Sequence, residues 1–220
     1  MSLSPLLITF VSLLLAVGCG TTRYSVQVNG FLDVNAPTIF APGAAISVLE
    51  NQEAKNPLLE REIAVKIRRL LADRGYRAVS DEQAEYYLLF MYGVGPTEMA
   101  PAAGPSVAIG IGAGSWRGAG GFIGLGGPYP YYPYPYSLEP IHNRWLTLKV
   151  VEGKRYRQSG QAQAVWVGES RSSGASPELR EVINALLLAT FQQFGKDTRQ
   201  AITVEVRTED PKYRELQSLR

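Results

Sequence analysis

The stretch that decides the fold is NPLLEREIAVKIRRLLADRG, residues 56–75. Asn56 can cap a helix, Pro57 suits its first position, and Gly75 provides the stop. Between these signals the apolar residues recur at helical spacing: Leu59, Ile63, Ile67, Leu70 and Leu71. The pattern predicts an amphipathic helix with one buried face. The charged residues are assigned to its solvated surface, and these include Glu60, Glu62 and Lys66.

Strands are predicted on both sides of this helix. Tyr24, Val26 and Val28 alternate with polar residues, which is typical of a strand with one buried face. A second short strand is expected over Ala45–Leu49. The run Tyr86–Tyr92 is apolar at both even and odd positions, so it predicts a central strand covered on both faces.

The C-terminal half combines further strands with a second helix. Alternation over residues 146–150 and a strand over 162–167, joined by a glycine turn at 152–154, predict a hairpin. A second helix follows between Ser176 and Gly195, then a last strand around 202–206. The tail from residue 209 is polar and is expected to be loose or partly helical. The elements predict an α+β fold: a two-layer sandwich with a mostly antiparallel sheet of five or six strands and both helices on one face.

The N-terminal residues predict export and lipid attachment. The uncharged apolar run Leu6–Val17 has 12 residues, whereas a membrane-spanning helix needs about 20, so an export signal is favoured. The string Ala16-Val17-Gly18-Cys19 looks like the lipobox of bacterial lipoproteins, and Cys19 is the only cysteine. Residues 1–18 are therefore predicted to be a signal peptide and 19–220 a single domain lipidated on Cys19. The alternative is an unmodified buried cysteine. Gly20 favours the outer membrane over the inner one, by resemblance to enterobacterial sorting.

Residues 93–140, the Gly-rich segment, differ in composition from the rest of the domain. They hold more than half of the chain's 22 Gly and 14 Pro. Short strands are expected over 107–111 and 123–125, and the prolines of 129–136 favour an extended display of aromatic rings. The candidate partner-binding residues are Trp116, Tyr129, Tyr131, Tyr132, Tyr134 and Tyr136. Three interpretations remain open: a low-complexity loop, a partner-binding or self-association element, and a hairpin that enters the bilayer.

Composition and motifs argue against catalysis and nucleic-acid binding. A formal charge of +2 with 19% charged residues gives no field of one sign for nucleic acid. The sequence has one histidine, His142, and no Gly-x-Ser-x-Gly motif that would place a nucleophilic serine for it. The glycines of 110–114 lack the Gly-Lys-Ser/Thr ending of a phosphate loop. The basic cluster 154–157 is expected to cap a hairpin turn in solvent, with anionic head groups as the alternative ligand. We therefore predict no catalytic residue, cofactor site or metal site.

Several of these segments together resemble a family of bacterial lipoproteins with the domain of unknown function 4136. The helix from Asn56 ends in Gly75-Tyr76, and an acidic stretch at 81–85 precedes the strand at Tyr86. A Trp-containing strand at 164–168 and a long apolar helix follow the Gly-rich segment. The resemblance spans most of the mature chain. It implies no known activity, substrate or catalytic residue.

The function hypothesis is a lipid-anchored, non-enzymatic envelope lipoprotein with a structural or accessory role on the periplasmic face of the outer membrane. Its expected partners are membrane lipid, through the anchor, and an envelope protein or a second copy of the chain. One alternative is a self-assembling membrane component that uses the Gly-rich hairpin. The other alternative is an enzyme of unknown type.

Overall fold

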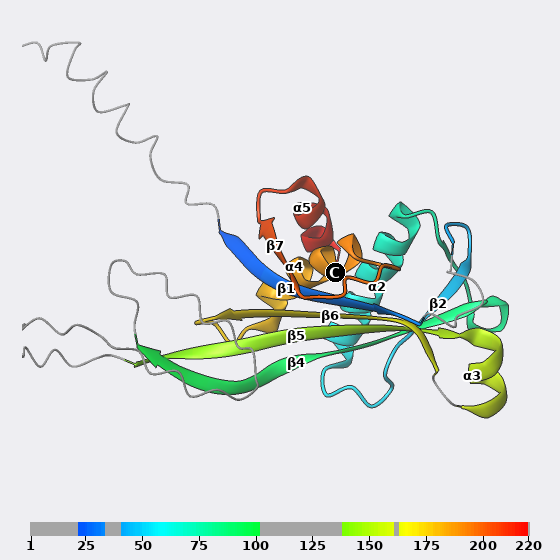
Figure 1. The fold of residues 1–220 in the computed structure, drawn as a ribbon, viewed down its shortest axis with the longest axis horizontal. Coiled ribbons are helices and arrows are strands. Elements are labelled where there is room, and N and C mark those ends of the chain that lie inside the picture. The colour runs from blue at the N-terminus through cyan, green and yellow to red at the C-terminus, as the bar shows by residue number, and fades with distance from the viewer. Residues whose placement is uncertain (1–21, 34–40, 102–137, 161–162, 220) are drawn as a thin grey trace, which may run out of the picture.

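The fold is a single sheet with helices packed on it, and the computed structural model describes residues 22–33, 41–101, 138–160 and 163–219. The sheet has seven strands in the order β3-β2-β4-β5-β6-β1-β7 (Figure 1). The strands are β1 (Arg23–Leu32), β2 (Ala45–Leu49), β3 (Arg77–Ala78), β4 (Tyr86–Pro101), β5 (Leu138–Glu152), β6 (Ala164–Gly174) and β7 (Ile202–Arg207). The helices are α2 (Pro57–Asp73), α3 (Gly153–Ser159), α4 (Leu179–Gln192) and α5 (Pro211–Ser218), with a 3-10 turn η1 (Asp81–Gln83).

The predicted α+β class is confirmed, but the details of the sheet differ. The described part of the sheet contains seven strands, not five or six, because β3 is too short to show any alternation in the sequence. The sheet is also mixed, since β2 pairs in parallel with β3 and β4 while the other neighbours are antiparallel. The parallel pairs arise because α2 carries the chain back across the sheet between β2 and β4, as parallel connections require.

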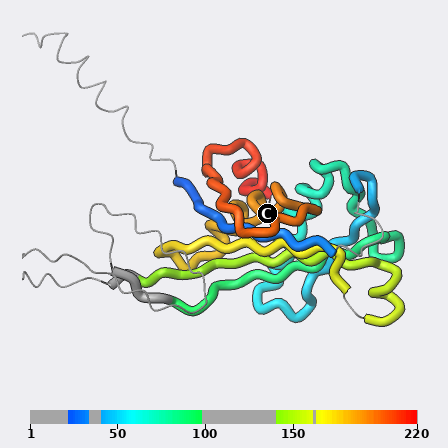
Figure 2. The backbone as a smooth tube through the Cα atoms, in the orientation of Figure 1, coloured from blue at the N-terminus to red at the C-terminus, as the bar shows by residue number. Residues whose placement is uncertain are grey.

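The main core lies between one face of the sheet and the helices α2 and α4. The Asn56 side chain accepts a hydrogen bond from the Leu59 amide at 3.1 Å, and Gly75 closes the helix with a φ of +81°. Ile63 and Ile67 on α2 belong to the same buried cluster as the strand residues Leu88, Leu146 and Leu148. Both predicted helices therefore lie on one face, and α5 lies on the same side (Figure 1; Figure 2).

Two described helices, α3 and α5, are more regular than the sequence predicted for their segments. The helix α3 replaces the tight turn expected at 152–154, and it begins where a Cβ on Gly153 would lie 2.7 Å from the Ala84 carbonyl. The helix α5 lies in the tail that was expected to be loose or partly helical, and it buries Tyr213 and Leu216 against the core. Both helices are short, so neither has enough turns to show a clear apolar stripe.

The strand β4 is covered on both faces at one end only. Leu88 and Phe90 are buried beneath the helices, and on the opposite face Tyr87 is buried where the ring of Tyr156 meets it edge-on at 5.3 Å. Further along that face Met91 is 57% exposed. The prediction of a fully covered strand is therefore wrong from Met91 on, because the small apolar cluster on that face ends with the partly buried Leu89.

Candidate functional site

The residues that the sequence singled out for binding lie outside the described residues. This holds for the predicted lipidation site Cys19 and for the six candidate partner-binding residues Trp116, Tyr129, Tyr131, Tyr132, Tyr134 and Tyr136. The described chain does, however, include the elements that flank both segments. Thr22 and Arg23 follow Cys19, while β4 and β5 carry the Gly-rich segment.

The two flanking regions lie at the same end of the sheet. Gln27 pairs with Arg171, so four residues earlier Arg23 lies just past the last residue of β6, Gly174. Gly174 pairs with His142, and His142 pairs with Thr97. We call this the ribbon end of the sheet, because β4 and β5 continue beyond it as a two-stranded ribbon (Figure 1).

The ribbon takes in both borders of the predicted Gly-rich segment. The pairing of β4 with β5 runs on to Pro101 opposite Leu138, so residues 93–101 and 138–140 belong to strands. An irregularity in register between Val94 and Thr97 coincides with Pro96. Proline lacks the amide hydrogen that a regular ladder needs, and it is tolerated at a bulge.

Arginines lie near the ribbon end on the sheet face opposite α2 and α4. Arg23 pairs directly with Arg207, and both side chains are exposed. Arg171, also exposed, lies on the same face opposite Gln27. One of the three is partly neutralised, since Arg207 forms an ion pair with Glu209 at 3.7 Å. The ribbon end therefore carries exposed cationic side chains, with the carboxylate of Glu205 opposite Ser25 on the same face.

A buried cluster of charges lies between α2 and α4, on the other face of the sheet. Lys66 is 1% exposed, and its Nζ lies 2.6 Å from Oε1 of Glu62. The second carboxylate oxygen of Glu62 accepts a hydrogen bond from Arg180 at 2.5 Å. Asn184 is 3% exposed, and its Oδ1 is the buried side-chain atom without a hydrogen-bond partner in the described part of the chain. A cavity of about 480 Å³ borders the cluster.

Burial and pairing act in opposite directions on the Glu62 carboxyl. Burial raises its pKa, but the hydrogen bonds and positive charges of Lys66 and Arg180 outweigh that effect, so the pKa lies below its usual value. A carboxylate held between two cations is a weak proton acceptor. The cluster therefore has the character of a structural ion pair more than of a general base.

The assignment of Glu60, Glu62 and Lys66 to the solvated surface of the helix is wrong. Glu60 is 4% exposed and accepts a hydrogen bond from the Asn51 amide at 2.8 Å, and Glu62 is 6% exposed. The sequence held a signal for this burial. Glu60 precedes Ile63 by three residues, and Lys66 precedes Leu70 by four, so both charged residues continue the apolar stripe.

The remaining candidates show no catalytic arrangement among the described residues. The Nδ1 of His142 lies 3.2 Å from the hydroxyl of Thr97 on the exposed ribbon. In the cluster 154–157 Arg157 is not simply solvated, because it donates to the Ala84 carbonyl at 2.9 Å and to the Tyr87 hydroxyl at 3.1 Å. Within the described ranges no group of three His, Cys, Asp or Glu residues could hold a metal ion. The helices described there are also not long and apolar enough to cross a membrane.

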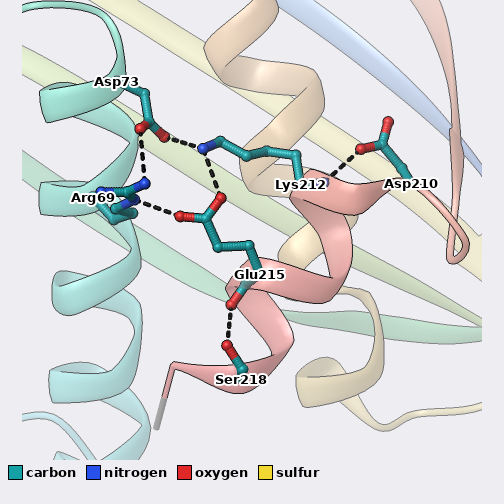
Figure 3. A network of polar contacts seen from close by, with 6 residues as sticks. All are labelled: Arg69, Asp73, Asp210, Lys212, Glu215 and Ser218. Carbon is teal, nitrogen blue, oxygen red and sulfur yellow. Dashed lines mark hydrogen bonds and ion pairs between the residues drawn. The ribbon is translucent and has the colours of Figure 1, made fainter.

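A network of ion pairs fixes α5 to α2 (Figure 3). The Nζ of Lys212 lies 2.5 Å from Asp73 and 2.8 Å from Glu215. Arg69 bridges the same two carboxylates from α2, at 2.5 Å from Glu215 and 3.4 Å from Asp73. Asp210 caps α5 by accepting a hydrogen bond from the Lys212 amide at 2.7 Å. The network explains how a polar C-terminal segment is held in a fixed place.

Docking of α5 is expected to weaken in acid. Lys212 and then Arg69 hold the pKa of Glu215 below its usual 4.5, so Glu215 contributes stability that is present above that value and lost as the pH falls through the folded pKa. The replacement Glu215→Gln should remove this acid-dependent part. The difference in unfolding temperature between wild type and variant should therefore shrink as the pH falls from 7 to 3. At pH 7, 0.5 M salt should also reduce this difference. A constant difference across that range would contradict the role of Glu215.

One protein family matches the sequence over most of the folded domain. The profile described as Domain of unknown function (DUF4136) matches residues 24–194, from β1 to just beyond the end of α4. No curated protein matches the sequence.

Some solved structures are similar to this chain at low identity. A variant of the PelC dodecamer from Paraburkholderia phytofirmans is 13% identical, with a TM-score of 0.39, and the match covers 80% of this chain and 99% of that one. A second PelC dodecamer structure from that organism is 12% identical, with a TM-score of 0.37 and coverage of 75% and 94%. A PDZ domain protein from Parabacteroides distasonis is 11% identical, with a TM-score of 0.45 and coverage of 85% and 40%. Similarity at this level carries no argument about function.

Proposed function

This chain belongs to the DUF4136 family, and we propose that it is a lipid-anchored, non-enzymatic envelope lipoprotein with an accessory or structural role on the periplasmic face of the outer membrane. The proposal joins the lipobox around Cys19 to the fold that follows it. In this proposal the folded domain is held at the membrane and offers its surfaces to other envelope components.

The observation that carries the proposal is how closely the sheet follows the lipidation site. The strand β1 begins at Arg23, four residues after Cys19, and it is an interior strand between β6 and β7. The Thr22 carbonyl also accepts a hydrogen bond from the Thr208 amide at 3.1 Å. No long linker can therefore separate a lipid on Cys19 from the domain. Such an arrangement suits a protein that works at the membrane surface.

The polar groups of the domain support a role without catalysis. Both carboxylate oxygens of Glu62 are engaged by cations, and the side chain of Lys66 is enclosed with that carboxylate. His142 lies on the exposed ribbon, with a threonine hydroxyl as its neighbour. An accessory role needs a stable scaffold, which these pairs provide, whereas an enzyme needs reactive groups that face a substrate.

The experiment that tests the proposal is replacement of the predicted lipidation site. Wild-type cells grown with a radioactive fatty acid should label the protein, and the protein should fractionate with outer membranes. Because two or more acyl chains anchor a protein far more strongly than one, Cys19→Ser should lose the label and move almost completely to the soluble fraction. Ser4→Ala, within the predicted signal peptide, is the matched control and should keep the label. A label that persists in Cys19→Ser would overturn the lipoprotein assignment.

A further inference from the structure

We propose that the ribbon end of the sheet faces and contacts the lipid bilayer, so that the end of β4 and the start of β5 point toward the membrane. This inference rests on the proposed function, since it takes the lipid on Cys19 as its starting point. It adds an orientation and a contact surface to that function. The surface consists of the start of β1 and of the ribbon formed by β4 and β5. It includes Arg23, Thr97 and His142.

The first step is the reach of the chain between the lipid and the fold. Thr22 is the third residue after Cys19, and three residue steps of fully extended chain span at most about 11 Å. The membrane surface at an acylated Cys19 therefore lies within about that distance of the start of β1. Figure 1 shows β1 beginning on the same side of the molecule as the end of β4 and the start of β5.

The second step is the length of the ribbon. Four further residue pairs continue β4 and β5 beyond Thr97 and His142, up to Pro101 opposite Leu138. At about 3.3 Å per residue these pairs extend the ribbon by about 13 Å past Thr97 and His142, and by about 10 Å past the level of Arg23. The extension past Arg23 is close to the length of the longest possible tether. A domain held by Cys19 with its sheet upright therefore brings the ribbon to the lipid surface.

The third step is the charge at this end. Arg23 and Arg207 are neighbours on the uncovered face, and Arg171 follows deeper in the sheet. Glu209 offsets one of these charges through its ion pair with Arg207, and Glu205, which pairs with Ser25, places a carboxylate on the same face. Arg23, at the ribbon end itself, is therefore the arginine placed for anionic head groups. Guanidinium groups bind phosphates through paired hydrogen bonds, so the surface chemistry agrees with the geometry.

The orientation also decides between the two basic regions of the protein. Lys154 is the second residue of α3, which begins directly after β5 ends at Glu152. Glu152 lies ten positions after His142 on β5, which corresponds to about 33 Å along the strand. With the ribbon end at the bilayer, the cluster 154–157 points away from it. Head groups of the same membrane are then not the ligand of that cluster.

The test uses the fact that Cys19 is the only cysteine. Because acylation blocks that thiol, Thr97→Cys and Lys154→Cys each offer one reactive thiol in the full, acylated chain. Each variant is labelled with a bimane fluorophore and placed in vesicles of phosphatidylethanolamine and phosphatidylglycerol that carry a nitroxide on the lipid. We expect the nitroxide to quench the probe at Thr97 at least three-fold more than the probe at Lys154.

Each result of this test has a distinct meaning. Equal quenching at both positions, or none at Thr97 in protein that floats with the vesicles, would overturn the inference and leave the anchor intact. A ribbon that binds a protein partner at a distance from the lipid would give this second result. Protein whose mass shows no acyl group on Cys19 would overturn the proposed function and the inference together.

Discussion

Replacing Glu62 with alanine is expected to lower the free energy of unfolding by about 3–5 kcal/mol, because it removes the carboxylate that lies against the enclosed, charged Lys66. The Lys66 side chain is 2% exposed and lies 2.6 Å from the carboxylate that would be removed. Breaking a buried pair from one side costs far more than the pair itself contributes. Urea denaturation at pH 7, followed by tryptophan fluorescence, measures the change.

Two further variants separate the buried pair from its exposed partner. Arg180 is 56% exposed in its side chain, so Arg180→Ala should cost no more than about 1 kcal/mol. The double replacement of Glu62 by leucine and Lys66 by methionine should fall within about 1 kcal/mol of wild type, because neither charge is then buried. If Glu62→Ala lowers the free energy of unfolding by less than about 1 kcal/mol, water reaches Lys66. The interpretation of Glu62 and Lys66 as a buried ion pair would then be wrong.

The elements with several turns or regular alternation could be predicted from the sequence. The helix α2 begins at Pro57 after the Asn56 cap, as its sequence indicated, and β2 coincides with the predicted Ala45–Leu49. The short elements could not be predicted. The two residues of β3 show no period, and α3 forms because Gly153 allows the chain to approach the carbonyls of Ala84 and Glu85. That contact depends on residues far away in the sequence.

The candidate sites also differ in whether a local sequence pattern or contacts between distant residues define them. The lipobox at Cys19 is a local motif, so the sequence alone was sufficient to propose it. The ribbon end required the registers of three strand pairs, because only these place Arg23 at the same end of the sheet as His142 and Thr97. The burial of Lys66 required the position of α4, which supplies Arg180 and Asn184. Helical spacing shows which residues share a face, but it does not show what covers that face.

Trp166→Ala is the second replacement with a large expected effect, about 3–5 kcal/mol of unfolding free energy. Trp166 is fully buried on β6, and its ring meets the ring of Phe194 edge-on at 4.8 Å. Its indole nitrogen donates a hydrogen bond to the Lys196 carbonyl at 3.0 Å. Alanine would leave a cavity and an unpaired carbonyl together. Thermal and urea unfolding, measured by circular dichroism, give the size of the effect.

Gly168 provides the matched control, because the backbone there makes room for the indole. A Cβ on Gly168 would lie 2.2 Å from the Trp166 ring and 2.8 Å from Thr190, so Gly168→Ala alone should cost about 1–3 kcal/mol through overpacking. Once Trp166 is alanine, the same methyl group enters the vacated space. The double variant should then be more stable than the sum of the two single losses predicts, by about 1 kcal/mol or more. Simple additivity would mean that the strain at Gly168 comes from Thr190 instead, and that the indole does not determine which residue β6 can carry at this position.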